Sequence, residues 1–411
     1  MNTGDTAWVL ISTVLVFAMT IPGLAFFYGG LVRRKNVLSI LMQCFIIMCV
    51  ISLQWALFGY SLSFGPDAGG LGIIGSLKWA GLQYVGGQPN GDYAATIPHS
   101  VFMIFQCMFA VITPALMIGA FAERMKFSAF LVFTVLWATL VYDPLAHWVW
   151  GTGGWMRTLG GLDFAGGIVV HASSGVSALV LCLLLGKRLG YQRIPFRPHN
   201  LPFTVLGGAL LWFGWFGFNA GSALGANELA AHAFVTTHLA TAAAGLAWAL
   251  CEWQQHGKPT ILGTVTGAVA GLVAVTPACG FVNPINAVFI GIIAALVCYL
   301  AVTAIKARLG YDDALDAFGV HGVGGIWGTI AVGLFAEKAV NAAGADGLFF
   351  GGAQLGPQLV MAAVAPLFAG VMTFAIFKLV DALMCVRVGE KDEHIGLDLT
   401  QQSEAAYTII E

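Results

Sequence analysis

The chain has 411 residues, of which 58% are hydrophobic and 9% are charged, and its formal net charge is −2. A soluble domain carries about 25% charged residues on its surface, so this composition excludes a water-soluble fold and indicates an integral membrane protein. The small net charge also argues against a nucleic-acid partner.

Apolar runs long enough to cross a bilayer recur along the whole chain. A hydrocarbon core about 30 Å thick needs about 20 apolar residues in a helix, and these runs are continuous, whereas barrel strands would alternate. The first six residues lack the basic region of a signal peptide, so the first run is expected to stay in the protein. We therefore predict an all-α membrane protein with eleven transmembrane helices. The predicted spans lie near residues 7–31, 37–64, 98–122, 128–150, 165–186, 201–221, 229–254, 260–277, 283–308, 318–336 and 358–386.

The loops between these spans differ in basic residues, which set the orientation of a membrane protein. If the N-terminus is outside, all of the 18 Lys and Arg residues except Lys78, Arg157 and Lys338 lie on the cytoplasmic side. We therefore predict an outside N-terminus and a cytoplasmic C-terminus. Residues 1–386 would form the membrane domain, and residues 387–411 a polar cytoplasmic tail that packs on it or contacts a regulator.

Two histidines, His171 and His321, lie inside the fifth and tenth predicted spans among small residues. An ionisable residue at membrane depth is costly and is a functional-site hypothesis by default. Each follows an aspartate, Asp163 or Asp316, at the start of its segment. Five spans followed by five of opposite orientation predict an inverted repeat, with its site near the midplane. Repeat one would cover about 7–186 and repeat two about 201–336, and the eleventh helix, about 358–386, would be an addition.

Other chemical signals are weak. The eight cysteines form no CxxC spacing, so the sequence predicts no zinc or redox site. We find no nucleophile and base pair and no phosphate-binding loop, so we expect neither an enzyme nor a cofactor. GTVTGAVAG at residues 263–271 spaces small residues four apart, which predicts close helix packing.

Several longer motifs occur in order along the chain: IPGLAFFYGG at 21–30, FQCMF at 105–109, GAFAER at 119–124, DFAGG at 163–167, GWFGFNAGS at 214–222, TPACG at 276–280 and FGVHG at 318–322. Together they resemble the Amt/MEP/Rh family of ammonium transporters over essentially the whole chain. The aromatic external motifs favour the bacterial-type Amt branch. The resemblance implies a homotrimer in the bacterial cytoplasmic membrane, with a pore in each protomer and a PII-type regulatory protein at the cytoplasmic face.

The resemblance also assigns roles to aromatic residues. It places Phe105, Trp150 and Ser222 at an external recruitment site, where an aromatic face attracts a cation and a hydroxyl can accept one of its hydrogens. It places the rings of Phe109 and Phe218 as a gate beneath that site. Without the resemblance, Trp150 would equally suit membrane-interface anchoring, and the two phenylalanines ordinary packing.

The resemblance makes His171 and His321 the twin histidines of the pore, with Trp215 beside them. Buried imidazoles favour the neutral form, which offers one donor and one acceptor. Such a pore should pass ammonia and reject potassium, which cannot lose a proton. Whether the proton of ammonium follows by a separate route is left open by the sequence.

Aspartates near the spans allow two roles. Asp163 could bind ammonium directly or cap the fifth helix, and capping is the preferred interpretation. Asp312, Asp313 and Asp316 precede the tenth span and are expected to start that helix and to dock the tail. For the whole chain, the alternatives to a transporter are a non-conducting ammonium sensor with the same fold and an Rh-type gas channel.

Overall fold

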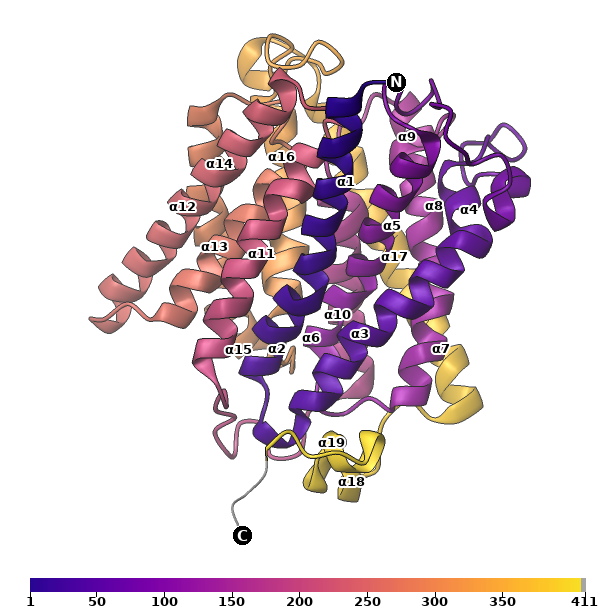
Figure 1. The fold of residues 1–411 in the computed structure, drawn as a ribbon. Helices are drawn as coiled ribbons and strands as arrows, with labels where there is room; N and C mark the ends of the chain where they lie inside the picture. Colours follow the sequence, from indigo (N-terminus) through magenta and orange to yellow (C-terminus); the bar gives the residue numbers. More distant parts are fainter. Residues whose placement is uncertain (408–411) are drawn as a thin grey trace.

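The computed structural model describes residues 1–407, and within them the regular structure is helical, with only isolated bridges between single residues. Ten helices are long and apolar enough to cross a membrane, and a shorter apolar helix, Ile261–Val275, lies at the predicted eighth span. The all-α membrane fold is thus confirmed. The N-terminus and the last helices lie at opposite ends of the bundle (Figure 1), as an odd number of crossings requires.

The spans are built as follows, several with a π-helical turn inside. The first five contain α1 (Thr3–Ala18) with α2 (Ala25–Leu31), α3 (Val37–Gln54) with α4 (Tyr60–Phe64), α5 (His99–Leu116) with α6 (Ile118–Phe121), α7 (Phe127–Trp137) with α8 (Asp143–Trp150) and the short α9 (Trp155–Thr158), and α10 (Ser173–Leu185). The others contain α11 (Leu201–Gly221), α12 (Glu228–His256), α13 (Ile261–Val275), α14 (Pro284–Leu300) with α15 (Lys306–Leu309), α16 (Val323–Phe335) and α17 (Leu355–Met384), followed by α18 (Glu390–Ile395) and α19 (Leu397–Gln402) in the tail.

Helix starts follow from local capping chemistry. Side-chain oxygens of Asn200, Asn227, Thr260 and Asn283 accept backbone N–H groups in the first turns of α11, α12, α13 and α14. These N–H groups have no partner within the helix, so a polar side chain before an apolar run fixes where each span begins.

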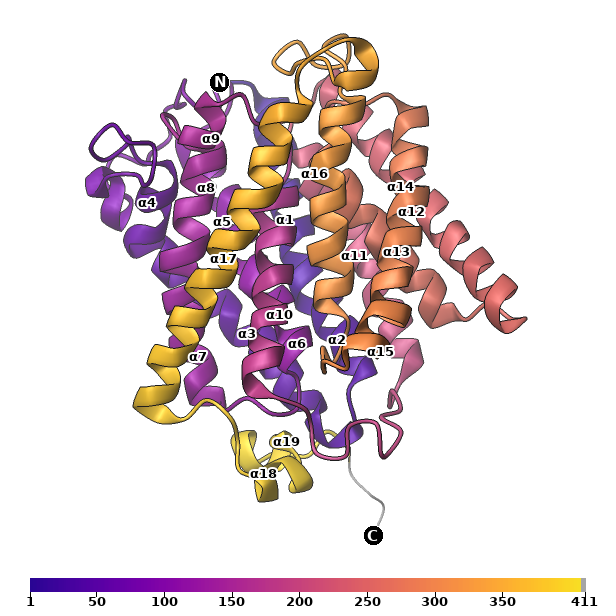
Figure 2. The same ribbon diagram turned by 180° about the vertical axis from the view of Figure 1, so that it is seen from behind.

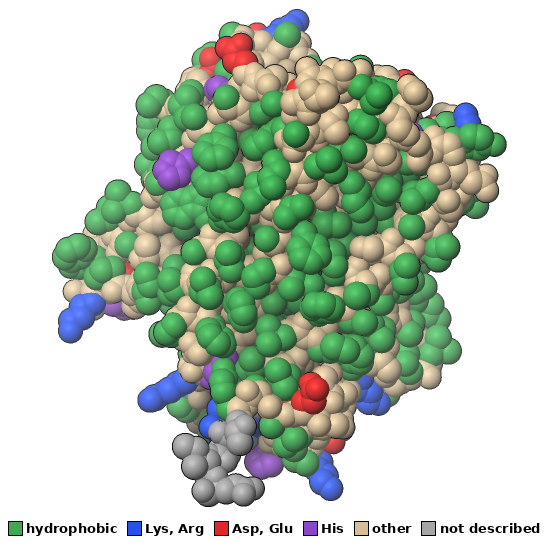
Figure 3. Space-filling model, in the orientation of Figure 1, with side chains coloured by type: hydrophobic (Ala, Val, Ile, Leu, Met, Phe, Trp, Pro, Cys, Tyr) green, Lys and Arg blue, Asp and Glu red, His purple; other side chains and the backbone are tan. Residues whose placement is uncertain are grey.

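The surface matches a bilayer environment. Hydrophobic side chains cover the middle of the molecule, whereas Lys, Arg, Asp and Glu gather at its two ends (Figure 3). The helix α17 runs obliquely across the outside of the bundle (Figure 2). The chain therefore presents an apolar belt to lipid, as its composition predicts.

Small residues let the helices approach closely inside the bundle. A methyl group added at Gly271 of α13 would lie 2.6 Å from the Ala244 Cβ of α12, and one at Gly325 of α16 would lie 3.0 Å from the His171 Cβ. The predicted packing role of the 263–271 motif is thus confirmed. The second contact brings the two histidine segments together.

A buried charge network joins the loops at the tail end. Arg188 contacts Asp312 at 2.7 Å and Glu123 at 3.2 Å, and Arg33 contacts Glu123 at 2.8 Å. Burial alone would raise the pKa of Glu123, but Arg188 and Arg33 outweigh it and hold that pKa below its usual value. The network ties the loops after the first, third, fifth and ninth spans into one rigid face.

The tail packs on this face, as predicted. Asp398 accepts the Ser39 backbone N–H at 2.8 Å, Asn36 accepts the Leu397 N–H at 2.8 Å, and Glu393 accepts the Leu189 N–H at 2.6 Å. Within residues 1–407, no hydrogen bond or ion pair joins the tail to Asp312, Asp313 or Asp316. The expectation that these aspartates dock the tail is wrong, because they are already engaged by Arg188, by backbone N–H groups of the tenth span and by Lys306.

Candidate functional site

Two cavities enter the bundle from opposite ends. The upper cavity, on the side of the N-terminus, measures about 490 Å³, and its lining includes Phe109, Trp150 and Ser222. The lower cavity, on the side of the tail, measures about 340 Å³, and its lining includes His321 and Asp316. Phe218 and His171 are 0% and 1% exposed and lie between the two cavities. These residues therefore lie along one line between the two ends of the bundle, whereas Phe105, which was predicted with them, lines neither cavity.

Trp150 and Ser222 are held in fixed positions in the upper cavity. The Trp150 indole N–H donates to the Asp163 carbonyl at 2.9 Å, which fixes the plane of the ring. The Ser222 hydroxyl donates to the Phe218 carbonyl at 2.8 Å, so its oxygen keeps lone pairs that can accept a hydrogen from a solute. An aromatic face and an acceptor hydroxyl thus line the same cavity.

Phe105 occupies a different position from the one that the resemblance implies. Its side chain is 0% exposed and packs against the Phe109 ring with centroids 5.0 Å apart. It does not belong to the described residues that line the upper cavity. In this conformation Phe105 supports the Phe109 ring from behind.

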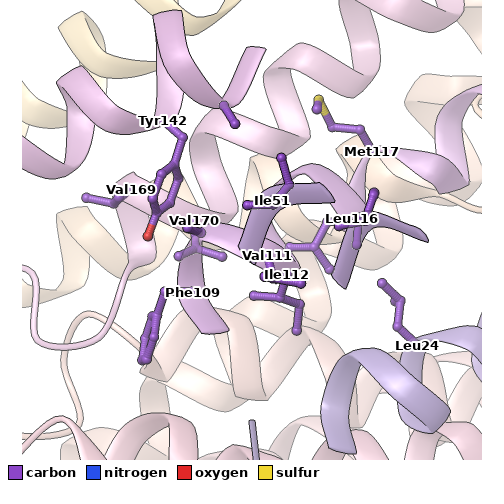
Figure 4. Close-up of a cluster of buried hydrophobic side chains, with 14 of the residues drawn as sticks. Leu24, Ile51, Phe109, Val111, Ile112, Leu116, Met117, Tyr142, Val169 and Val170 are labelled. Atoms are coloured by element: carbon purple, nitrogen blue, oxygen red, sulfur yellow. The ribbon is translucent and has the colours of Figure 1, made fainter. Parts of the chain in front are cut away.

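Phe109 and Phe218 close the bottom of the upper cavity. Their ring centroids lie 4.2 Å apart at an interplanar angle of 29°, and the Trp150 ring lies 6.0 Å from Phe109. Figure 4 shows Phe109 near Val169 and Val170 in a cluster of buried hydrophobic side chains, and Val170 directly precedes His171 in the sequence. The stacked rings and the apolar side chains around them separate the upper cavity from the histidines.

His171 and His321 meet below the phenylalanine pair. Their Nδ1 atoms are 3.3 Å apart, and the ring planes differ by 19°. One nitrogen must donate and the other accept, so at least one ring is neutral. His171 Nε2 is buried and has no hydrogen-bonding partner in the described structure, which leaves it free for a solute that passes between the cavities.

Trp215 supports this pair. Its ring stacks on His171 at 5.3 Å and 20°, and its indole N–H donates to the Thr276 hydroxyl at 2.9 Å. Since the indole nitrogen is engaged elsewhere, Trp215 offers the path an apolar face. The structure thus brings together all three residues predicted for the pore.

Asp163 caps the helix that carries His171. Its two carboxylate oxygens accept the backbone N–H groups of Gly166, Gly167, Ile168 and Val169 at 2.7 to 3.3 Å. Four donors satisfy most of the acceptor capacity of a carboxylate. This geometry fits capping and leaves little of the group to bind a cation.

Asp313 starts the tenth span, as expected, and is the residue that corresponds to Asp163, a match that was not predicted. It accepts the N–H groups of Ala317 and Phe318 at 3.1 and 2.8 Å, at the start of the turn that carries His321. The prediction paired Asp163 with Asp316 instead, and it is wrong because the Asp316 carboxylate contacts Lys306 at 2.6 Å. The usable signal was spacing: Asp313 precedes His321 by eight residues, as Asp163 precedes His171.

The π-helical turns Gly167–Ala172 and Phe318–Gly322 place the two histidines. Gly166 precedes the first turn with φ of 117°, a conformation that a side chain would strain. Residues 1–407 contain no cluster of three or more His, Cys, Asp or Glu side chains that could hold a metal ion. Two cavities that face each other across buried aromatic rings and imidazoles, inside an apolar bundle, are typical of a membrane transport protein for a small solute.

Comparisons with known proteins show the family to which this membrane transport protein belongs. The sequence profile described as the Ammonium Transporter Family matches residues 7–407. A protein of Bacillus subtilis named ammonium transporter is 56% identical over 408 residues, which cover 99% of each chain. Ammonium transporter Amt1 of Archaeoglobus fulgidus is 47% identical over 99% of this chain and 100% of its own. The chain therefore belongs to the ammonium transporter family, which is a family of multi-pass proteins of the cell membrane.

Solved structures support the same fold. The crystal structure of Saccharomyces cerevisiae Mep2 superposes with a TM-score of 0.89 at 37% identity, covering 95% of this chain and 89% of that one. A structure described as a sensor Amt protein also superposes with a TM-score of 0.89, at 29% identity, covering 97% and 98%.

Proposed function

We propose that this protein moves ammonium across the cell membrane, with ammonium entering the upper cavity and ammonia passing the histidines. Relatives named ammonium transporters, 47% and 56% identical over nearly the whole chain, support the substrate. The observation that carries the mechanism is the His171 and His321 pair, enclosed between two cavities beneath a closed pair of rings.

The upper cavity supplies recruitment. Ammonium against the face of Trp150 gains about 0.5–2 kcal/mol, and the Ser222 oxygen can accept one of its hydrogens. The cation then meets the Phe109 and Phe218 rings, where dehydrating a charge is very costly. Transfer of one proton from ammonium to water of the outer solution, above the rings, yields neutral ammonia, for which that cost is small.

The histidines then carry ammonia through the dry segment. Ammonia can donate to one unprotonated ring nitrogen and accept from a ring N–H, so the pair can replace its lost water. Potassium has neither option, because it cannot donate a hydrogen bond or lose its charge. The same residues therefore give both passage and selectivity.

The main alternative is a sensor that binds ammonium without conducting it. The similarity to a sensor Amt structure shows that this fold can serve such a protein. The higher identity to proteins named transporters favours conduction. The form in which the nitrogen crosses, as ammonium or as ammonia with a separate proton, is part of the proposal. The same experiment tests it.

The decisive experiment uses the full chain in liposomes. An ammonium gradient should produce a saturable change in internal pH or current, and an equal potassium gradient should produce neither. Protein that is folded and inserted but gives no response to ammonium would overturn the transport proposal in favour of the sensor. A reporter fused to the C-terminus and active only outside the cell would contradict the proposed orientation.

Recruitment is tested by Trp150→Leu and Ser222→Ala. We expect Trp150→Leu to raise KM for ammonium by about two- to thirtyfold, the range of a cation and aromatic ring contact, with a smaller rise for Ser222→Ala. Trp253→Leu is the matched control, because Trp253 is 59% exposed on α12, outside the path. An unchanged KM in both site variants would place recruitment elsewhere.

Assembly and partners complete the proposal. His238 is exposed on α12 and packs 5.4 Å from the Trp212 ring, on a face that an isolated protomer would present to lipid. A polar ring facing hydrocarbon is unfavourable, so this face supports the proposed homotrimer. We also propose that the charged face that carries the tail is the docking surface for a PII-type protein.

The proposed inverted repeat is supported by two matching segments, 163–171 and 313–321, in each of which an aspartate precedes a histidine by eight residues.

A further inference from the structure

One ion pair lies at the mouth of the lower cavity and has no role in the pathway described above. Lys306 Nζ contacts Asp316 Oδ1 at 2.6 Å, with the two side chains 18% and 28% exposed. Asp316 lines the same cavity as His321. A carboxylate thus faces the space into which ammonia emerges after the histidines.

The backbone at this position is unusual. Asp316 has φ of 60°, in the left-handed region that few residues other than glycine adopt. Its carbonyl accepts the Val320 N–H at 3.0 Å, which ties the residue to the turn carrying His321. The loop therefore holds the carboxylate in place at the cavity wall.

The other carboxylate of this cavity is engaged. Glu252 lines the cavity but accepts the Thr260 backbone N–H at 2.7 Å and the Thr260 hydroxyl at 2.9 Å. Asp316 is bound instead by Lys306, whose side chain ends in an alkylammonium. The chain itself thus places a substituted ammonium on the carboxylate beside the pore exit.

We propose that the Asp316 carboxylate can bind ammonium in the lower cavity and that Lys306, by pairing with it, prevents this binding in the native protein. Ammonia that takes a proton from water of the tail-side solution in the lower cavity becomes a cation beside this carboxylate. With Lys306 in place, that cation finds the carboxylate already paired and leaves for bulk water. Without Lys306, the carboxylate retains it and slows the next passage. This inference rests on the proposed transport function.

The test measures inhibition from the tail side. Full-length protein is reconstituted with its tail towards the lumen, and initial ammonium uptake is followed as luminal ammonium is raised. Lys306→Met should lower the luminal ammonium concentration that halves uptake by about two- to fivefold, the range expected for a partly exposed ion pair. Lys306→Arg, which keeps a cation on Asp316, should retain the wild-type value.

Removing the carboxylate should cancel the effect. The double variant Lys306→Met with Asp316→Asn should lose the added sensitivity and match Asp316→Asn alone. Lys258→Met is the matched control, because Lys258 is an exposed lysine in the loop before α13. An unchanged half-inhibition value in Lys306→Met, or a change that persists in the double variant, would overturn the inference.

Uptake into an ammonium-free lumen and uptake against luminal ammonium test different proposals. With an ammonium-free lumen, Lys258→Met should take up ammonium at the wild-type initial rate, and the uptake of each variant in that lumen is the reference for its own half-inhibition value. Absence of uptake in the wild type would refute transport itself. Normal uptake with no difference in luminal inhibition would refute only the role of Lys306 and Asp316.

Discussion

Replacing His171 and His321 together by leucine should reduce ammonium-dependent flux in liposomes by about 5- to 150-fold. Each ring offers a passing ammonia a hydrogen bond worth a net 0.5–1.5 kcal/mol, and leucine offers none. His171 Nε2 is buried without a partner, so leucine there costs the folded protein no existing contact at that atom. The variant should therefore fold and lose flux.

A suitable control is His394→Leu, since His394 is exposed on the tail helix α18. It should leave both flux and potassium exclusion unchanged. If the double leucine variant instead kept the wild-type ammonium flux and the wild-type rejection of potassium, the histidines would have no part in selection. Potassium leakage together with ammonium flux would show that they act as the charge barrier.

Replacing Asp163 by alanine should abolish uptake and lower the free energy of unfolding by about 1.5–3 kcal/mol. The carboxylate accepts four backbone N–H groups, and hydrogen bonds to charged acceptors are the stronger ones. Losing this cap would loosen the turn Gly167–Ala172, which positions His171. Asp163→Asn keeps one acceptor oxygen and should give an intermediate result for both quantities.

Measuring both uptake and the free energy of unfolding distinguishes helix capping by Asp163 from direct binding of ammonium by Asp163. A cap predicts that stability and uptake fall together in the order wild type, asparagine, alanine. A direct ammonium ligand predicts a raised KM with unchanged stability, which would contradict our interpretation. Asp381→Asn is the control: Asp381 accepts the Val386 N–H at 2.9 Å near the end of α17 and lines neither cavity, so its loss should leave KM unchanged.

Much of the fold was predictable because hydropathy is a local property. The predicted sixth span, 201–221, has the bounds of α11, and the predicted eleventh, 358–386, is displaced by only a few residues from α17 at Leu355–Met384. Polar residues such as Asn200 mark helix starts by capping, and this signal is visible in the sequence. The π-helical turns that carry the histidines were not predicted, because they arise where helices cross closely.

The sequence singled out residues that the structure places close together, but their roles stay predictions. Trp150, Ser222, Phe109, Phe218, His171, His321 and Trp215 follow one path in the structure. Phe105 packs behind the Phe109 ring and does not line the upper cavity, because the direction of a side chain depends on neighbours that are distant in sequence. Asp316 was mistaken for the partner of Asp163, since proximity to the span alone did not reveal which aspartate reaches the helix N-terminus.

The sequence by itself determined the class of this protein. Long apolar runs with few charges are stable as helices in a lipid bilayer. Ionisable side chains inside such runs are costly, so they point to a functional site. Only the tertiary structure decided how those side chains act. Two histidines 150 residues apart share one hydrogen bond because a glycine, Gly325, lets their helices meet. That contact, like the pairing of Lys306 with Asp316, depends on packing between segments, which no local pattern encodes.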